Sequence, residues 1–165
     1  MRYLVQERLF SITADFWIED ESGNQVFRVD GSGPFSREAF SLRDLNGNLL
    51  TYIRKKAFSW RETLQIESEG GLVASVRAAF ALFSQRYEID LASGSELEAH
   101  GNFTGKDFEI RSANGHVYGR VSKERFRMRD TYWVDVPDES NAPLMISIAV
   151  CIDRIHEDAE REHRH

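Results

Sequence analysis

The fold is decided by the stretch Phe40-Ser41-Leu42-Arg43-Asp44-Leu45-Asn46-Gly47, because its pattern recurs along the chain. In each copy a phenylalanine stands seven positions and an aliphatic residue five positions before a glycine, and a β-branched residue follows six positions after it. The other clear copies are Phe16-Trp17-Ile18-Glu19-Asp20-Glu21-Ser22-Gly23 with Val29, and Phe108-Glu109-Ile110-Arg111-Ser112-Ala113-Asn114-Gly115 with Val121. Apolar residues two apart before a turn glycine form one face of a strand, and glycine adopts the positive φ of tight hairpin turns. Each copy therefore predicts a β-hairpin.

Two looser copies extend the series. One runs from Leu64-Gln65-Ile66-Glu67 through Gly70-Gly71 to Val76, and the other runs from Tyr87-Glu88-Ile89-Asp90-Leu91 to Gly94. An opening strand near Tyr3–Gln6 and a closing strand at Tyr132–Val136 bring the expected number of strands to about twelve. So many short alternating strands indicate a barrel or a sandwich.

The segment after Pro137 departs from this alternation. Every residue from Ala142 to Ile152 is apolar except Ser147, and Asn141 is a candidate N-cap. The run predicts a helix that is buried on all sides, and its polar continuation, from Asp153 to about Glu162, is expected to leave the core. The apolar part would be only ~14 Å long, against the ~30 Å of a bilayer's hydrocarbon, so no transmembrane helix is predicted.

A twelve-stranded barrel has the dimensions to hold this helix. Strands ~4.7 Å apart and tilted by ~40° give a backbone diameter of ~24 Å, and side chains then leave about the 10–12 Å of a helix. We therefore predict an all-β fold, a twelve-stranded closed antiparallel barrel around a hydrophobic C-terminal helix. A β-sandwich with the helix across one open end is the alternative, and it would leave one side of the helix in solvent.

Several segments spread over the chain also share a family pattern. They are Arg2–Gln6, Phe16–Ile18 with Gly23–Val29, Leu49–Lys56, Gly101–Phe103 and Ala149–Ile155. Together they resemble the LURP-one-related proteins. The resemblance implies a single tubby C-terminal-like barrel domain, expected over residues 1–160 with a frayed polar tail at 161–165, and a fold shared with the phospholipid scramblases. It brings no catalytic residues with it.

Composition limits the class of protein. A chain of 165 residues with 41% hydrophobic and 29% charged residues is typical of one soluble globular domain. Its net charge of −6 argues against non-specific binding of nucleic acid. The single cysteine, Cys151, forms no internal disulfide, and the N-terminus does not resemble a signal peptide. We therefore expect a cytoplasmic protein, peripheral at the membrane where it meets lipid.

The candidate binding residues form two basic clusters. Within Lys123-Glu124-Arg125-Phe126-Arg127-Met128-Arg129, alternate side chains of a strand would share one face, so Arg125, Arg127 and Arg129 are expected in one row. The second cluster is Arg54, Lys55 and Lys56 with Arg61, which would extend the row if the two strands lie close. Guanidinium groups suit phosphate or carboxylate groups. The alternative is a solvated outer wall whose arginines pair with neighbouring acids.

Catalytic, metal and cofactor sites are not predicted. Cys151 lies in the buried run, and His156 stands ~140° from it around the helix axis, so the two do not share a face. His156, Glu160 and His163 do share a face, but on a terminal helix that is expected to be solvated. The three tryptophans are expected in the core or the barrel wall. They are Trp17, Trp60 and Trp133.

These observations favour a non-enzymatic binding module. We expect its partner to be an anionic phospholipid headgroup at a membrane surface, or another protein. A small-molecule carrier or enzyme with a ligand cavity in the barrel is one alternative, and a cavity of ~300 Å³ or more would favour it. A protein–protein interaction scaffold is another, and an exposed apolar patch on the wall would favour that.

Overall fold

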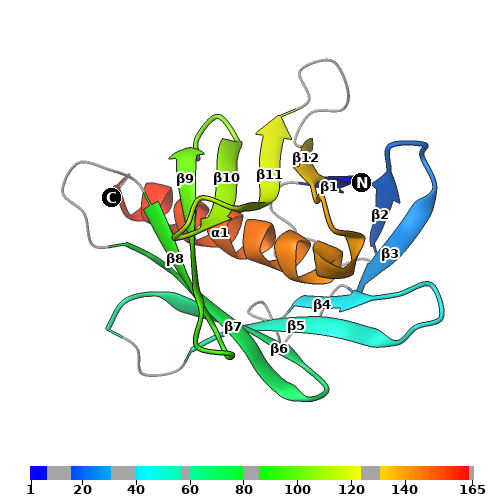
Figure 1. Cartoon of the computed structure of the whole chain (residues 1–165), viewed down its shortest axis with the longest axis horizontal. Helices are drawn as coiled ribbons and strands as arrows, with labels where there is room; N and C mark the ends of the chain where they lie inside the picture. Colours follow the sequence, from blue (N-terminus) through cyan, green and yellow to red (C-terminus); the bar gives the residue numbers. More distant parts are fainter. Residues whose placement is uncertain (7–15, 31–39, 57–59, 80–85, 124–130, 164–165) are drawn as a thin grey trace.

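A computed structural model gives the structure of the chain and describes residues 1–6, 16–30, 40–56, 60–79, 86–123 and 131–163 (Figure 1). These residues form twelve strands, a short 3₁₀ helix (Glu139–Asn141) and one α-helix, α1 (Ala142–His163). The strands are β1 (Arg2–Gln6), β2 (Phe16–Asp20), β3 (Gln25–Asp30), β4 (Phe40–Arg43), β5 (Leu49–Lys55), β6 (Thr63–Ser68), β7 (Gly71–Ala78), β8 (Arg86–Leu91), β9 (Glu96–Asn102), β10 (Asp107–Ser112), β11 (Val117–Lys123) and β12 (Thr131–Asp135).

The sheet closes on itself. Each strand pairs antiparallel with its neighbours in the sequence, and β1 pairs with β12 over five positions. Strands β9–β12 lie on one side of α1 and β4–β7 on the other (Figure 1). The predicted twelve-stranded closed barrel around a C-terminal helix is therefore confirmed, and the sandwich alternative is wrong.

The register of the hairpins explains the repeat in the sequence. The phenylalanine of each copy lies directly across from the β-branched residue after the glycine, in the pairs Phe16–Val29, Phe40–Ile53 and Phe108–Val121. Each hairpin has a register shift directly after its aliphatic residue, and its glycine has a φ between 82° and 87°. The repeat therefore encodes a cross-strand pair, an irregularity and a turn residue with left-handed backbone.

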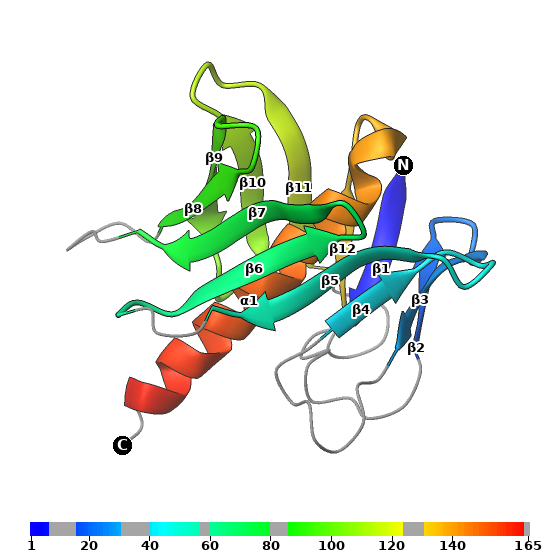
Figure 2. The ribbon, with the colours of Figure 1, turned by 90° about the horizontal axis from the view of Figure 1, so that it is seen from below.

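The up-and-down topology sorts the connections between the two ends of the barrel. The glycine turns β2–β3, β4–β5, β6–β7, β8–β9 and β10–β11 lie at one end, together with the N-terminus. We call it the turn end. The connections β1–β2, β3–β4, β5–β6, β7–β8, β9–β10 and β11–β12 lie at the opposite end, which we call the loop end. Helix α1 starts beside the N-terminus and runs toward the loop end (Figure 2).

The first half of α1 fills the barrel. Met145, Ile146, Ile148 and Cys151 are each at most 1% exposed, as the apolar run predicted. They pack on inward-facing side chains from all the strands around them, among them Val5, Ile18, Leu42, Ile53, Ile66, Val76, Ile89, Ile110, Val121 and Val134, which are fully buried. No helix among the described residues is long and apolar enough to cross a membrane.

Ser147, the one polar residue of the run, is paired inside the barrel. Its hydroxyl oxygen lies 2.7 Å from the hydroxyl oxygen of Thr51 on β5, and it donates to the carbonyl oxygen of Pro143 at 2.7 Å. Both Ser147 and Thr51 are buried, so each hydroxyl has the partner that burial demands.

Two sequence predictions about this region and the tryptophans are wrong, and a third stays a prediction. Asn141, the candidate N-cap, directly precedes α1 and ends the 3₁₀ helix that Asp138 caps by accepting from the backbone N–H of Ser140. The polar half of α1 does not leave the core at Asp153, which is 8% exposed. Trp60 is neither core nor wall, because 84% of its surface is exposed.

The position of these residues explains the differences. Asp153 stays inside because Lys106 from the β9–β10 connection neutralises it, and Ile155, two residues further along α1, is buried as well. Helix α1 is exposed only from Ala159 onward, and it reaches His163, three residues into the expected tail. Trp60 stands between β5 and β6, outside the alternating positions of either strand.

Candidate functional site

The loop end carries a group of basic residues and an exposed tryptophan on the two sides of one connection. It consists of Arg54 and Lys55 at the end of β5, Lys56 after it, and Trp60 and Arg61 before β6. We call this group the basic corner. The backbone N–H of Lys56 donates to the carbonyl oxygen of Thr63 at 2.8 Å, so the two sides of the β5–β6 connection are held together.

Side chains of the basic corner contact few acids. A guanidinium nitrogen of Arg54 lies 2.8 Å from Glu67 on β6, and the ammonium of Lys55 lies 3.9 Å from Glu62. These side chains of Arg54 and Lys55 remain 55% and 45% exposed. The guanidinium carbon of Arg61 lies 5.0 Å from the centroid of the Trp60 ring, which is a cation–π contact.

Glu62 connects the basic corner to α1. Burial, a hydrogen bond that Glu62 donates to Asp158 and the negative charge of Asp158 raise the pKa of Glu62 to about 8, although Lys55 and Arg154 act in the opposite direction. The pKa of Asp158 is lowered, because hydrogen bonds from Glu62 and Arg154 and the charges of Arg154 and Lys55 outweigh its own burial. The two carboxyl groups therefore share one proton at neutral pH, with the charge on Asp158 beside Arg154 at 3.0 Å.

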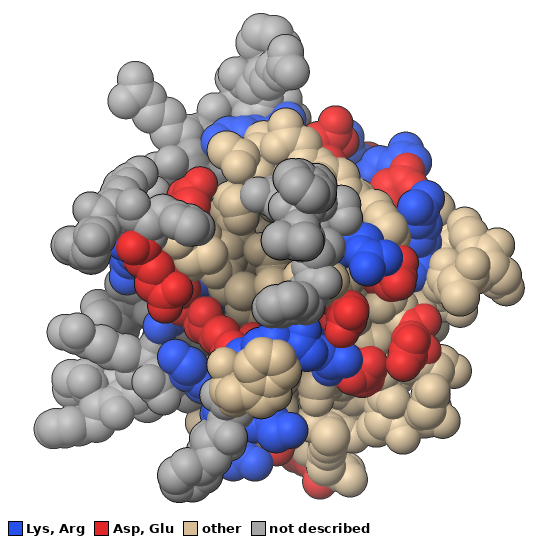
Figure 3. Space-filling model, turned by 90° about the vertical axis from the view of Figure 1, so that its left-hand side faces the viewer, with Lys and Arg blue, Asp and Glu red and all other residues tan. Residues whose placement is uncertain are grey.

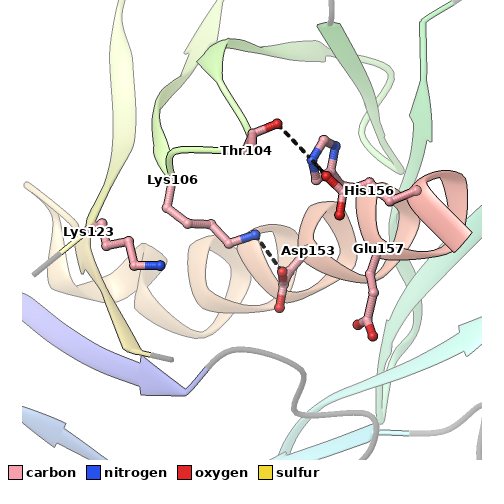
Figure 4. A pocket seen from close by; sticks show the side chains of 7 residues that line it. Thr104, Lys106, Lys123, Asp153, His156 and Glu157 are labelled. Atoms are coloured by element: carbon pink, nitrogen blue, oxygen red, sulfur yellow. Dashed lines mark hydrogen bonds and ion pairs between the residues drawn. The ribbon is translucent and has the colours of Figure 1, made fainter. Parts of the chain in front are cut away.

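A polar pocket of about 160 Å³ opens at the same end, beside α1 (Figure 4). It is lined by Thr104, Lys106, Lys123, Asp153, His156, Glu157 and Glu160. The ammonium of Lys106 lies 2.6 Å from Asp153, and both side chains are 10% exposed. Lys106 is also the one residue other than glycine with positive φ among the described residues.

Internal ion pairs occupy most of the charges in the polar pocket. Nε2 of His156 lies 3.3 Å from both the Thr104 hydroxyl and Glu160, and Glu157 accepts from Arg161 at 2.6 Å. The pocket is also smaller than the ~300 Å³ typical of small-molecule sites. Among the described residues, no three His, Cys, Asp or Glu side chains form a group that could hold a metal ion. The arrangement fits the tethering of the β9–β10 connection to α1 better than ligand binding.

A second depression, of about 230 Å³ and largely apolar, lies between β1 and β2. The two strands pair at only two positions, Tyr3–Asp20 and Leu4–Glu19. The lining residues are Leu4, Gln6, Phe16, Trp17, Glu19, Gln25 and Thr131. It lies in the wall, not inside the barrel, whose interior is occupied by α1.

Comparison with known proteins adds the family. A family model described as LURP-one-related matches residues 1–153. The chain belongs to the LURP-one-related family. It is similar to the uncharacterized protein YxjI of Bacillus subtilis (strain 168), with 23% identity over 151 residues that cover 92% of this chain and 91% of that protein.

A solved structure has the same fold as this LURP-one-related protein. An X-ray structure of an Arabidopsis thaliana protein matches with a TM-score of 0.67 and 13% identity, over 94% of this chain and 91% of the other. At this identity the likeness shows the shared fold. The family description and the relative's name assign no enzymatic activity.

Only some of the binding residues that the sequence predicts for this LURP-one-related protein lie in the part that the structure describes. Arg125, Arg127 and Arg129 lie outside the described residues, so the row they form stays a prediction. The second cluster is on the loop end, and Lys123 ends β11 at the same end. However, β5 and β11 have five strands between them in either direction around the ring, so Lys123 stands across the barrel mouth from the basic corner. The strands that carry Lys123 and Lys55 therefore do not lie close.

The charge on this end of the molecule is mixed (Figure 3). Lysine and arginine side chains are interspersed with aspartate and glutamate side chains where α1 ends. A basic site must therefore be local, as the net charge predicted.

The sequence analysis missed the exposure of Trp60 and the Glu62–Asp158 pair. The exposure of Trp60 could have been inferred from its position between two strands. The Glu62–Asp158 pair could not, because it joins the β5–β6 connection to α1 and no sequence pattern relates these two segments.

Proposed function

We propose that this protein binds anionic phospholipid headgroups at a membrane surface through its loop end. The observation that carries the proposal is the basic corner. Arg54, Lys55, Lys56 and Arg61 supply four positive charges, against which stands the negative charge of Glu67. Glu62 adds a second negative charge only above its raised pKa. Counted over the described residues of the basic corner and these two acids, the local net charge at neutral pH is then +3, in a chain whose total is −6.

Such a local charge favours weak, reversible binding. A basic residue near an anionic membrane contributes up to ~1 kcal/mol, and salt screens charges beyond a Debye length of ~8 Å at physiological ionic strength. Acidic residues that lie farther than this from the basic corner therefore weaken the attraction much less than their number implies. The carrier or enzyme alternative is less well supported, because α1 occupies the barrel interior where its cavity would lie.

Vesicle sedimentation tests the proposal. We expect the protein to bind phosphatidylcholine vesicles that contain phosphatidylglycerol more tightly than pure phosphatidylcholine vesicles, and to dissociate as salt rises. The double variant Lys55→Gln/Lys56→Gln should lower the partition coefficient roughly ten-fold or more at low salt. Arg111→Gln/Arg120→Gln removes the same charge from β10 and β11 and should have little effect.

Two outcomes would reject the proposal. One is equal binding of the unaltered protein to both kinds of vesicle. The other is an equal loss of binding in the two double variants, which would show that net charge matters and the basic corner does not. The triple variant Arg125→Glu/Arg127→Glu/Arg129→Glu in the same assay tests the row predicted from the sequence.

A further inference from the structure

Trp60 is the most exposed large hydrophobic side chain among the described residues, at 84%. Tryptophan side chains in folded proteins are on average well buried, so a ring in solvent calls for a physical reason. No strand geometry imposes this position, because Trp60 lies between β5 and β6 and points into no part of the barrel core.

Within the part of the chain that the structure describes, the other exposed large hydrophobic side chains lie at the opposite end. Leu45 is in the β4–β5 turn, Leu72 follows the β6–β7 turn, and Met1 is beside the end of β12. All three belong to the turn end. Among the described residues, the large exposed apolar group of the loop end is therefore the Trp60 ring, and it stands inside the basic corner.

The neighbours of Trp60 decide what kind of surface it fits. Lysine is depleted from the cores of protein–protein interfaces, where an exposed tryptophan would otherwise be a natural anchor. Tryptophan beside lysine and arginine is instead typical of the membrane–water interface, where the ring lies at the headgroup level and the cations face lipid phosphates. Arg61, stacked on the ring at 5.0 Å, brings a cation and the ring to the same point.

We infer that Trp60 inserts into the headgroup region of an anionic bilayer, so that the loop end of the barrel and the C-terminal end of α1 face the membrane. The inference rests on the proposed function and adds the residue that enters the membrane and the orientation that follows. The basic corner attracts the protein to the surface, and the ring adds an apolar contribution that salt does not screen.

Tryptophan fluorescence with vesicles tests this insertion. With phosphatidylglycerol vesicles we expect the emission of the unaltered protein to shift to shorter wavelength, and brominated acyl chains to quench it. Trp60→Phe should lose both signals, because Trp133 is 5% exposed and Trp17 lies in the barrel wall. Sedimentation of the same samples measures how much protein is bound, independently of the fluorescence.

Binding of matched variants gives the second readout. Trp60→Ala should lower the partition coefficient roughly ten-fold and leave residual binding at high salt weaker than that of the unaltered protein. Leu45→Ala removes an exposed apolar side chain from the turn end and should change neither measurement. Because both residues are exposed, both variants should melt at the temperature of the unaltered protein.

The failures of the two proposals are distinguishable. Bound protein whose tryptophan emission neither shifts nor is quenched would overturn the insertion of Trp60 and leave the lipid-binding proposal standing. Equal loss of binding in Trp60→Ala and Leu45→Ala would also overturn it. Absence of any preference for anionic vesicles would reject the proposed function, and the inference with it.

Discussion

Glu62 illustrates how one side chain can connect a surface to the core. Its carboxyl group lies between the basic corner and α1, and it shares a proton with Asp158. While Glu62 is protonated it adds no negative charge to the corner and donates to Asp158. When it ionises, two carboxylates face each other where β6 begins and α1 leaves the barrel, with the cations of Lys55 and Arg154 as partial compensation.

This arrangement makes stability depend on pH in a defined direction. The pKa of Glu62 is about 8 in the folded protein against a usual value of 4.5, so between these values the folded state holds a proton that the unfolded state has lost. Stability therefore falls as pH rises from about 5 to 8 and levels off above. Asp158, whose pKa is lowered, loses its contribution only in more acidic solution.

The variant Glu62→Gln isolates this effect, because it keeps a hydrogen-bond donor toward Asp158 and never ionises. We expect it to match the unaltered protein near pH 5 and to melt roughly 2–8 °C higher at pH 9, a difference reduced by solvent at this half-buried site. Thermal melting across this pH range measures it. Parallel curves of melting temperature against pH for the two proteins would show that Glu62 does not carry the shared proton.

At the scale of elements, the hairpins could be predicted from the sequence and part of α1 could not. A hairpin is a local structure, so the phenylalanine, its partner such as Ile53 and the turn glycine all fall within fourteen residues. The apolar half of α1 could also be predicted, because a helix without a polar face must be enclosed. Its polar half was misjudged, because the burial of Asp153 depends on Lys106, a partner 47 residues away in the sequence.

The enclosure of α1 predicts where the helix tolerates a charge. Ile148 is fully buried at the centre of the barrel, so Ile148→Asp places an unpaired carboxylate in the core. The cost is several kcal/mol and approaches the 5–15 kcal/mol stability of a typical domain. Ala159→Asp, on the exposed part of the same helix, should change stability by no more than about 0.5 kcal/mol.

Chemical denaturation of both variants measures these costs. A small change for Ile148→Asp would contradict a helix packed inside the barrel, because a helix on an outer surface has a face that accepts aspartate. A large change for Ala159→Asp would show that α1 remains enclosed beyond Asp158.

At the scale of the whole molecule, the topology determines which residues lie at the same end of the barrel. In a closed up-and-down barrel, alternate connections lie at opposite ends, so the five hairpin turns of the sequence repeat gather at one end and the other connections, the short β9–β10 connection among them, lie at the other. The basic residues of the candidate site could be identified from the sequence, but their arrangement in space could not be predicted from it. Whether Lys55 and Lys123 are neighbours depends on the order of strands around the ring, and that order places them on opposite sides of the mouth.

The central claim is that the loop end, and not the turn end, faces an anionic membrane. Ala78 ends β7 beside Arg61, which donates to its carbonyl oxygen at 3.4 Å, and Ala113 lies in the β10–β11 turn at the far end. Both alanines are exposed. Cys151, the one native cysteine, is fully buried and its pKa is raised by burial, so a thiol-reactive dye should label only a cysteine introduced at the surface.

The most direct measurement is the emission of an environment-sensitive dye on Ala78→Cys and on Ala113→Cys when phosphatidylglycerol vesicles are added. We expect the dye at residue 78 to shift to shorter wavelength and the dye at residue 113 to be unchanged, at equal fractions of bound protein. A shift at residue 113 alone, or equal shifts at both residues, would contradict the account.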